Sequence, residues 1–222
     1  MIRAAWALAL TASLAIGARP APARTTAPIV SPVWNDPARR DAAGEVGQLT
    51  SRLNIVAGMR IADIGAGDGY DALRLAPKVG PRGRIIAEDV REDYLAELRR
   101  RARAQGASNI VPLLGTAGDP HLAARSVDLV LMVHMYHEVA QPEQLLAHLA
   151  AALKPGGRLA IEDLDRPILA HGTPIALLRC ELAAAGWREL ALRALDGGLG
   201  YLAVFAPSSA RRRPARIAAC AG

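Results

Sequence analysis

The run VDLVLMV at residues 127–133 constrains the fold of this chain more than any other feature. It is apolar without alternation, whereas a strand with one face in water alternates apolar and polar residues. A strand of this kind is typical of a parallel sheet that helices cover on both faces. Further short apolar runs, separated by longer amphipathic stretches, predict a regular alternation of strands and helices.

This pattern predicts strands near residues 59–64, 84–89, 109–114, 127–133, 157–162, 187–194 and 199–206, and helices near 36–56, 69–78, 91–105, 141–153 and 173–185. The boundaries have local causes, as in the helix near 141–153, which has Pro142 in its first turn and ends before Pro155. Only residues 196–198 join the last two strands, so these strands must pair antiparallel. We therefore predict an α/β fold, a doubly wound Rossmann-like sheet of seven strands, mostly parallel, with a C-terminal antiparallel hairpin at one edge.

The N-terminus has the layout of a secretory signal peptide, with Arg3 before an apolar run and small residues that end at Ala23. The alternatives are a leader retained as an anchor and a misassigned start codon. We predict that the mature chain begins near Arg24 and is periplasmic or secreted, with a cytoplasmic location as the alternative. The predicted divisions are a signal peptide at 1–23, a linker at 24–35, a folded domain at 36–207 and a basic disordered tail at 208–222.

The net charge of +6 comes from the two ends of the chain, at Arg3, Arg19, Arg211, Arg212, Arg213 and Arg216. The remaining basic residues equal the 21 acidic residues in number. A neutral domain lacks the basic surface that nucleic-acid binding requires, so we expect no nucleic-acid partner. The apolar run of the leader is too short for a stable membrane span. Cys180 and Cys220 indicate no disulfide framework and neither support nor exclude export.

The stretch Asp63-Ile64-Gly65-Ala66-Gly67-Asp68-Gly69 follows the first predicted strand. Glycines let such a turn approach a ligand, and the helix that begins near Gly69 offers unpaired amide groups. A dinucleotide site would have glycine where this chain has Tyr70, and the acid before the turn argues against a pyrophosphate. A nicotinamide-dependent oxidoreductase is therefore disfavoured.

The same stretch, D-x-G-x-G-x-G, resembles motif I of the class I S-adenosylmethionine-dependent methyltransferases. The resemblance extends over about residues 36–206 and includes the edge hairpin, which is a feature of that family. It implies a methyltransferase with S-adenosyl-L-methionine as cofactor. The short loops around the acceptor side favour a small-molecule substrate. The alternative is a binding module that keeps the fold without turnover, and the oligomeric state stays open.

The resemblance also implies a cofactor site. In the family the second strand ends in an acid that binds both ribose hydroxyls; this is Asp89 here, with Glu88 as the alternative. Thr116 stands where the family has the acid that recognises adenine, which leaves Asp119 or backbone groups for this contact. The cofactor-binding residues that we predict are Asp63, Gly65, Ala66, Gly67, Gly69, Asp89, Val90, Thr116, Ala117, Asp119 and Val133.

A polar cluster follows the fourth predicted strand, and we predict His134, His137 and Glu138 as the catalytic residues. His137 and Glu138 could position or deprotonate an acceptor hydroxyl or amine. The alternative is that the cluster only caps the strand. His134 and His137 could also bind a metal ion with Glu138 or His171, but the spacing matches no standard site and we predict no metal.

Overall fold

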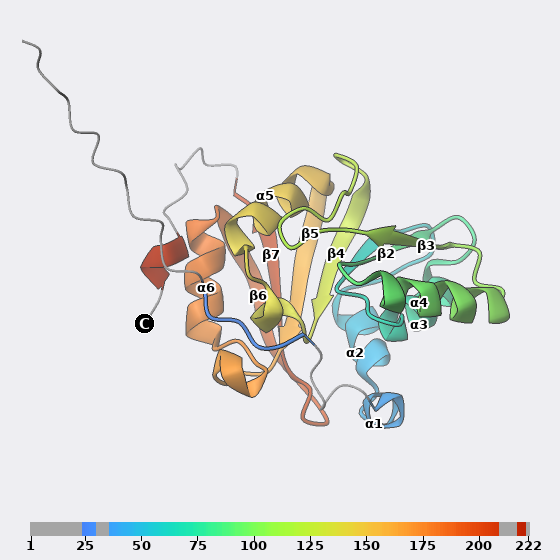
Figure 1. Cartoon of the computed structure of the whole chain (residues 1–222), viewed down its shortest axis with the longest axis horizontal. Coiled ribbons are helices and arrows are strands. Elements are labelled where there is room, and N and C mark those ends of the chain that lie inside the picture. The colour runs from blue at the N-terminus through green and yellow to red at the C-terminus, as the bar shows by residue number, and fades with distance from the viewer. Residues whose placement is uncertain (1–23, 30–35, 209–216, 221–222) are drawn as a thin grey trace, which may run out of the picture.

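The structure, a computed structural model, describes residues 24–29, 36–208 and 217–220 (Figure 1). The predicted signal peptide at 1–23 lies outside the described residues, as do residues 30–35 of the predicted linker and most of the predicted tail. Within the described part of the chain, no helix combines the length and apolar character needed to cross a membrane.

A seven-stranded sheet in the order β3-β2-β1-β4-β5-β7-β6 forms the centre of the molecule. Its strands are β1 Arg60–Ile64, β2 Arg84–Asp89, β3 Ile110–Leu114, β4 Val127–Val133, β5 Leu153–Asp163, β6 Trp187–Leu195 and β7 Gly200–Pro207. Strands β1 to β5 pair parallel, and β7 pairs antiparallel with both β5 and β6. The predicted fold class and the edge hairpin are confirmed.

Helices cover both faces of this sheet (Figure 1). The α-helices are α1 Pro37–Ala42, α2 Glu45–Arg52, α3 Tyr70–Val79, α4 Glu92–Ala104, α5 Pro142–Ala152 and α6 Ile175–Ala184, and the short 3-10 helices are η1 Tyr136–Glu138, η2 Ile168–Ala170 and η3 Ile217–Cys220. The predicted single helix near 36–56 is divided into α1 and α2, because Gly44 between them adopts a left-handed conformation with φ of 66°.

The two faces of β4 show why its sequence does not alternate. Leu129 and Leu131 belong to one hydrophobic core, which α2, α3 and α4 cover. Val130 and Met132 belong to a second core, which α5 and α6 cover. All four side chains are completely buried, as expected of a strand in the middle of a doubly wound sheet.

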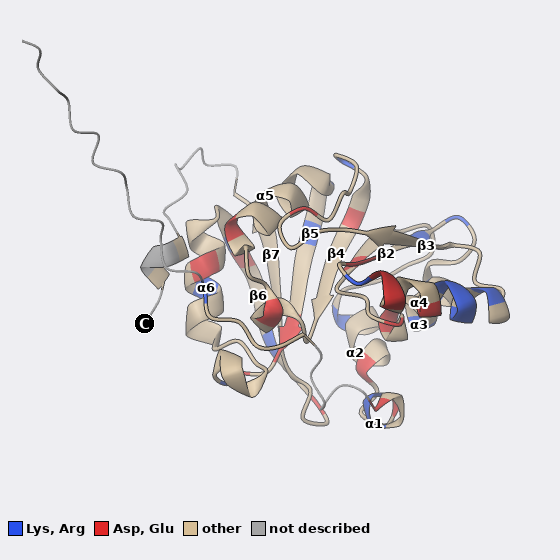
Figure 2. Ribbon diagram, in the orientation of Figure 1, with Lys and Arg blue, Asp and Glu red and all other residues tan. Residues whose placement is uncertain are grey.

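Charged residues of both signs are interspersed along the elements (Figure 2). The helix α4 is an example, with Glu92 and Asp93 in its first turn and Arg101 and Arg103 in its last turn. This arrangement complements the helix dipole at both ends. The distribution agrees with a domain whose own net charge is close to zero.

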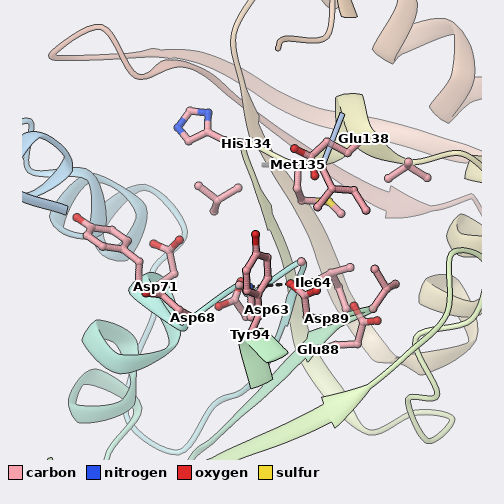
Figure 3. Close-up of a pocket in the computed structure, with 18 of the residues that line it drawn as sticks. Asp63, Ile64, Asp68, Asp71, Glu88, Asp89, Tyr94, His134, Met135 and Glu138 are labelled. Atoms are coloured by element: carbon pink, nitrogen blue, oxygen red, sulfur yellow. Dashed lines mark hydrogen bonds between the residues drawn. The ribbon is translucent and has the colours of Figure 1, made fainter. Parts of the chain in front are cut away.

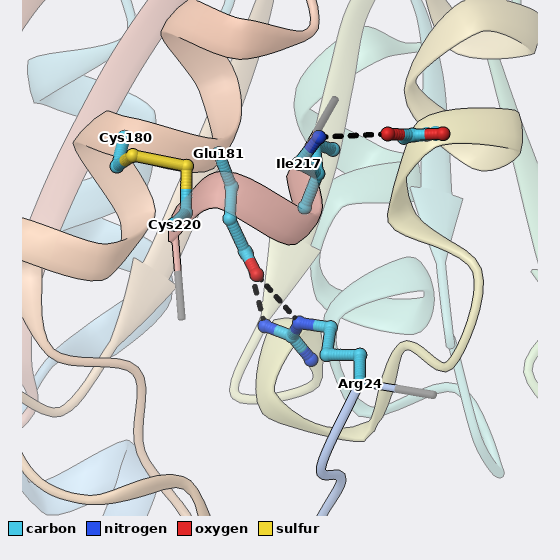
Figure 4. Close-up of a disulfide and its surroundings, with 6 residues drawn as sticks. Arg24, Cys180, Glu181, Ile217 and Cys220 are labelled. Atoms are coloured by element: carbon cyan, nitrogen blue, oxygen red, sulfur yellow. Dashed lines mark hydrogen bonds and ion pairs between the residues drawn. A yellow bond between two sulfur atoms is a disulfide. The ribbon is translucent and has the colours of Figure 1, made fainter. Parts of the chain in front are cut away.

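A disulfide joins Cys180 of α6 to Cys220 of η3, with an S–S distance of 2.13 Å (Figure 4). The expectation that these cysteines give no disulfide was therefore wrong, because the sequence does not show that the C-terminal segment packs beside α6. Ile217 is buried, and its N–H donates to the carboxylate of Glu143 at 2.7 Å. The prediction of a disordered tail is thus wrong for residues 217–220.

Candidate functional site

A cavity of about 580 Å³ opens at the carboxyl ends of β1, β2 and β4. This is the point where the winding of the sheet reverses, since β1 pairs with β2 on one side and with β4 on the other. Ligands of open α/β sheets bind at this position, and the volume suits a small organic molecule.

The glycine turn after β1 forms one wall of the cavity, and Gly67 and Gly69 have different roles in it. Gly65, Gly67 and Gly69 all have a positive φ, of 69°, 56° and 90°. A Cβ on Gly69 would lie 2.2 Å from the Leu98 side chain, so this glycine serves helix packing and does not line the cavity. Gly67 lines the cavity and has open space where a Cβ would be, so a ligand can approach its bare backbone.

Asp89 ends β2 next to this turn. Its carboxylate accepts hydrogen bonds from the backbone N–H groups of Gly67 at 2.8 Å and Arg91 at 2.9 Å (Figure 3). Each carboxylate oxygen keeps acceptor capacity for one more donor. Burial raises the pKa of Asp89, and the two N–H groups oppose this shift. Val90, the next residue, is half-exposed and lines the same cavity.

Glu88 also lines the cavity and is almost completely buried. Burial and the neighbouring Asp89 raise the pKa of Glu88 to about 8. A Cβ on Gly115 would lie 1.9 Å from Oε1 of Glu88, so a larger residue at this position requires the carboxyl group to move.

The loop after β3 contributes only part of what we predicted. Thr116 and Ala117 line the cavity. Asp119 does not, because its carboxylate accepts the backbone N–H of His121 at 2.8 Å within the loop.

The segment after β4 forms the opposite wall, where Val133, His134, Met135 and Glu138 line the cavity (Figure 3). His134 has a left-handed backbone with φ of 51°, and its Nε2 lies 3.2 Å from Oε1 of Glu162. Burial lowers the pKa of His134 to about 3, so its imidazole is neutral at physiological pH.

His137 lies behind this wall and does not line the cavity. Its Nδ1 is 3.1 Å from both carboxylate oxygens of Asp163, at the end of β5. Asp163 also accepts hydrogen bonds from the hydroxyl of Thr173 at 2.7 Å and the N–H of Leu164 at 2.8 Å. Of the three predicted catalytic residues, the structure therefore brings His134 and Glu138 to the cavity and places His137 outside it.

Comparisons with known proteins agree with this geometry. Residues 61–157 match the family described as "Methyltransferase domain". The chain is 32% identical over 137 residues to Methyltransferase GfsG of Streptomyces halstedii, a match that covers 59% of this chain and 49% of that protein. It is 34% identical over 120 residues to Aklanonic acid methyltransferase DauC of Streptomyces sp. (strain C5), which covers 53% of this chain and 52% of that protein.

A solved structure shares the fold. A crystal structure of a SAM-dependent methyltransferase from Aquifex aeolicus superposes with a TM-score of 0.67 at 22% identity, covering 77% of this chain and 97% of that chain. These matches indicate that residues 61–157 form a methyltransferase domain, similar to those of the class I S-adenosylmethionine-dependent enzymes. The chain spans about half the length of the two Streptomyces relatives.

The cofactor of this methyltransferase family is S-adenosylmethionine, and the cavity fits it. The open space at Gly67 and the remaining acceptor capacity of Asp89 provide a bare backbone and a partner for two vicinal hydroxyls. Six carboxyl groups line the cavity, at Asp63, Asp68, Asp71, Glu88, Asp89 and Glu138. Burial, then the proximity of Asp71, raises the pKa of Asp63. A bound sulfonium and ammonium would favour the charged forms of these acids.

Two groups that line the cavity were not predicted from the sequence. The guanidinium of Arg40, from α1, forms ion pairs with Glu45 and, at 2.8 Å, with Asp71, and it stacks on the ring of Tyr70. No sequence motif marks an arginine in a short polar helix. The one available signal was Asp71, which comes two residues after the glycine turn.

The second missed group is the N-terminal segment 24–29, which we predicted to be part of a linker. Thr26, Ala27 and Ile29 line the cavity. The N–H of Ala27 donates to the carbonyl of His137 at 3.0 Å. The Arg24 guanidinium donates to Glu181 at 2.8 Å and 3.1 Å and to the Val139 carbonyl at 2.9 Å (Figure 4). Residues 24–29 therefore form part of the cavity wall.

Proposed function

We propose that this protein transfers the methyl group of S-adenosylmethionine to a small-molecule acceptor. The observation that carries the proposal is one cavity with a glycine turn and Asp89 on one wall and His134 and Glu138 on the other. Methyl transfer from a sulfonium is an in-line displacement, so the protein chiefly positions the two reactants and excludes water. The opposed walls supply one surface for each reactant.

The electrostatics of the cavity support a cationic methyl donor. Arg40 is the basic side chain of the lining, and two carboxylates, Glu45 and Asp71, already pair with it. Asp63, Glu88 and Asp89 also line the cavity, and none of these three forms an ion pair with another described residue. A ligand that carries a sulfonium and an ammonium group supplies positive charge there.

On the acceptor side we assign different roles to the predicted catalytic residues. Glu138 lines the cavity and is the group placed to accept a proton from an acceptor hydroxyl or amine. His134 is neutral and a weak base because burial lowers its pKa to about 3, so it positions the acceptor. His137 does not reach the cavity and acts only through its neighbours.

The relatives and the cavity support a class of acceptor. One relative is named for aklanonic acid, and another is the Ubiquinone/menaquinone biosynthesis C-methyltransferase UbiE of Pseudomonas putida, 30% identical over 112 residues. A cavity of about 580 Å³ has room for the cofactor and a compact acceptor of this kind. We propose a small organic acceptor and no nucleic-acid partner.

We also propose that the mature chain begins near Arg24 and lies outside the cytoplasm. Two observations support this: a disulfide joins Cys180 to Cys220, and Arg24 is anchored on the folded domain. S-adenosylmethionine is made in the cytosol, so this location requires a route for the donor. Mass spectrometry of the N-terminus from fractionated cells tests the proposal; an intact Met1 in the soluble cytosolic fraction contradicts it.

Binding and turnover test the function separately. Isothermal calorimetry is expected to show binding of S-adenosylhomocysteine and none of NAD. Transfer from radiolabelled S-adenosylmethionine to a panel of quinols and phenolic acids is expected to label at least one acceptor. Binding without labelling of any acceptor would favour a non-catalytic binding module, and binding of NAD alone would contradict the proposal.

The assignment of Asp89 has its own matched pair of variants. Asp89→Ala removes the acceptor for two vicinal hydroxyls and should weaken S-adenosylhomocysteine binding by about 2 to 4 kcal/mol. Glu88→Ala, one residue earlier, should have a much smaller effect. Equal losses for the two variants in calorimetry would show that Asp89 is not the ribose ligand.

A further inference from the structure

We propose that His137, Glu138 and His171 bind a divalent transition metal ion, with zinc as the best candidate. This goes beyond methyl transfer, and its test needs no turnover; with an ion bound, Glu138 would be a metal ligand and not a free proton acceptor. Ligand atoms of the three side chains lie within 4.8 Å of one another. The sequence predicted no metal because these positions match no standard spacing, but η1 and the loop after β5 bring them together.

The imidazole of His137 is oriented so that Nε2 can bind a metal ion. Its Nδ1 faces the Asp163 carboxylate, which only accepts hydrogen bonds when ionised, so Nδ1 carries the proton and Nε2 has the free electron pair. The side chain is completely buried, and Nε2 has no hydrogen-bond partner among the described residues. A carboxylate behind a histidine in this way fixes the ring orientation at metal sites.

The other two side chains complete the cluster. Oε1 of Glu138 is 3.8 Å from Nε2 of His137. The His171 ring stands at 89° to the His137 ring, with 5.6 Å between the ring centres. With metal–nitrogen bonds of about 2.0 to 2.1 Å, two imidazole rings on a tetrahedral ion have centres roughly 5 Å apart, so small side-chain movements suffice.

The backbone of His171 is held in place by Arg166. Its Nδ1 is buried and has no hydrogen-bond partner within the described structure. The guanidinium of Arg166 donates two hydrogen bonds of 3.1 Å to the His171 carbonyl, which fixes the loop that carries the ring. Two imidazoles and one carboxylate are a ligand set that suits zinc. Because Glu138 also lines the cavity, the ion would lie in the wall of the proposed acceptor site.

A second cluster, Glu45, His134 and Glu162, is less suited to a cation. Its Glu45 carboxylate already pairs with the Arg40 guanidinium, and that positive charge opposes a second cation nearby. The cluster also offers one imidazole where the first offers two. For these two reasons we propose the metal site at His137 and not at His134.

Zinc uptake by the full chain tests the proposal. The protein is freed of metal with a chelator, kept without reductant so that the disulfide cysteines stay oxidised, and titrated with zinc and with cobalt. We expect about one zinc ion per chain and the visible absorption of a tetrahedral cobalt site. Circular dichroism and the unfolding temperature confirm that each variant is folded.

Two variants remove one ligand each. Glu138→Gln keeps the shape of a side chain that borders the cavity, and His171→Asn keeps a residue that tolerates the left-handed backbone at this position, where φ is 57°. Each should weaken zinc binding by at least about tenfold. The control is His148→Ala, which removes a half-exposed histidine of α5 outside the cluster and should leave zinc binding unchanged.

The proposal is overturned if the wild-type chain binds no zinc. It is also overturned if Glu138→Gln and His171→Asn bind zinc as tightly as His148→Ala does. A change of S-adenosylhomocysteine affinity without a change in zinc affinity would assign Glu138 to the cavity alone and contradict its role as a metal ligand.

Discussion

Glu88 and Asp89 are adjacent carboxyl groups whose surroundings differ. Asp89 accepts two backbone N–H groups, of Gly67 and Arg91, which help it to hold a negative charge. Glu88 is buried beside Gly115, and burial together with Asp89 raises its pKa to about 8. Burial raises the pKa of Asp89 as well, and its two backbone N–H donors oppose that shift.

The raised pKa of Glu88 predicts how stability depends on pH. Between about pH 4.5 and 8 the folded state holds a proton on Glu88 that the unfolded chain has released, so the free energy of unfolding falls as the pH rises through this window. Glu88→Gln removes the contribution. Because one pKa unit corresponds to about 1.4 kcal/mol, the free energy of unfolding of the variant should rise relative to that of the wild type by roughly 4 kcal/mol between pH 5 and pH 9.

Urea denaturation at the two pH values measures this gain. The control is Glu97→Gln on the exposed side of α4, where the carboxylate pairs with Arg100 at the surface. That variant should follow the wild-type pH dependence. If Glu88→Gln also shows the wild-type pH dependence of stability, the Glu88 carboxyl group is ionised in the folded state, which contradicts the prediction.

At the scale of the elements, α6 contacts both outer segments of the described structure, residues 24–29 and 217–220. Glu181 of α6 forms an ion pair with Arg24. Cys180, the residue before Glu181, forms the disulfide with Cys220 of η3 (Figure 4). The segment that begins at Arg24 then passes along the cavity. A helix far from the glycine turn in sequence thus holds part of the cavity wall in place.

Arg24→Ala should therefore weaken S-adenosylhomocysteine binding severalfold. The side chains of Arg24 and Glu181 are only 9% and 3% exposed, so their ion pair is a specific anchor for residues 24–29. The control is Arg179→Ala, which breaks an exposed ion pair with Glu189 on the same helix. Surface pairs contribute little, so this control should bind as the wild type does. Equal affinities for all three proteins in calorimetry would show that residues 24–29 do not contribute to the site.

At the scale of the whole molecule, the Cys180–Cys220 disulfide is a covalent crosslink between α6 and the C-terminal helix η3. It joins residues that are 40 positions apart, and all of β6 and β7 lie within the closed loop. A crosslink of this length restricts the unfolded chain and stabilises the folded state by comparison.

Reduction should lower the free energy of unfolding by about 2 to 4 kcal/mol, the contribution expected for a loop of this size. Guanidinium denaturation with and without reductant measures the loss. A Cys180→Ser/Cys220→Ser double variant should unfold like the reduced wild type and should not respond to reductant. Identical midpoints for oxidised and reduced wild type would contradict the contribution.

The sequence by itself determined the sheet, the edge hairpin and the position of the glycine turn. These features depend on local patterns, namely unbroken apolar runs such as residues 127–133, a short connection at 196–198, and glycines where φ is positive. Asp89 could be placed at the end of a strand for the same reason. Its position at the cavity follows from the rule that ligands bind at the carboxyl ends of the strands.

Only the tertiary structure decided which distant residues meet. The ion pair of Arg24 with Glu181 spans 157 positions, and the hydrogen bond of His137 with Asp163 spans 26. Neither pairing leaves a periodic or spaced signal in the chain, because each depends on how separate elements pack against one another. The disulfide, the cavity wall at residues 24–29 and the cluster at His137 are all consequences of this packing.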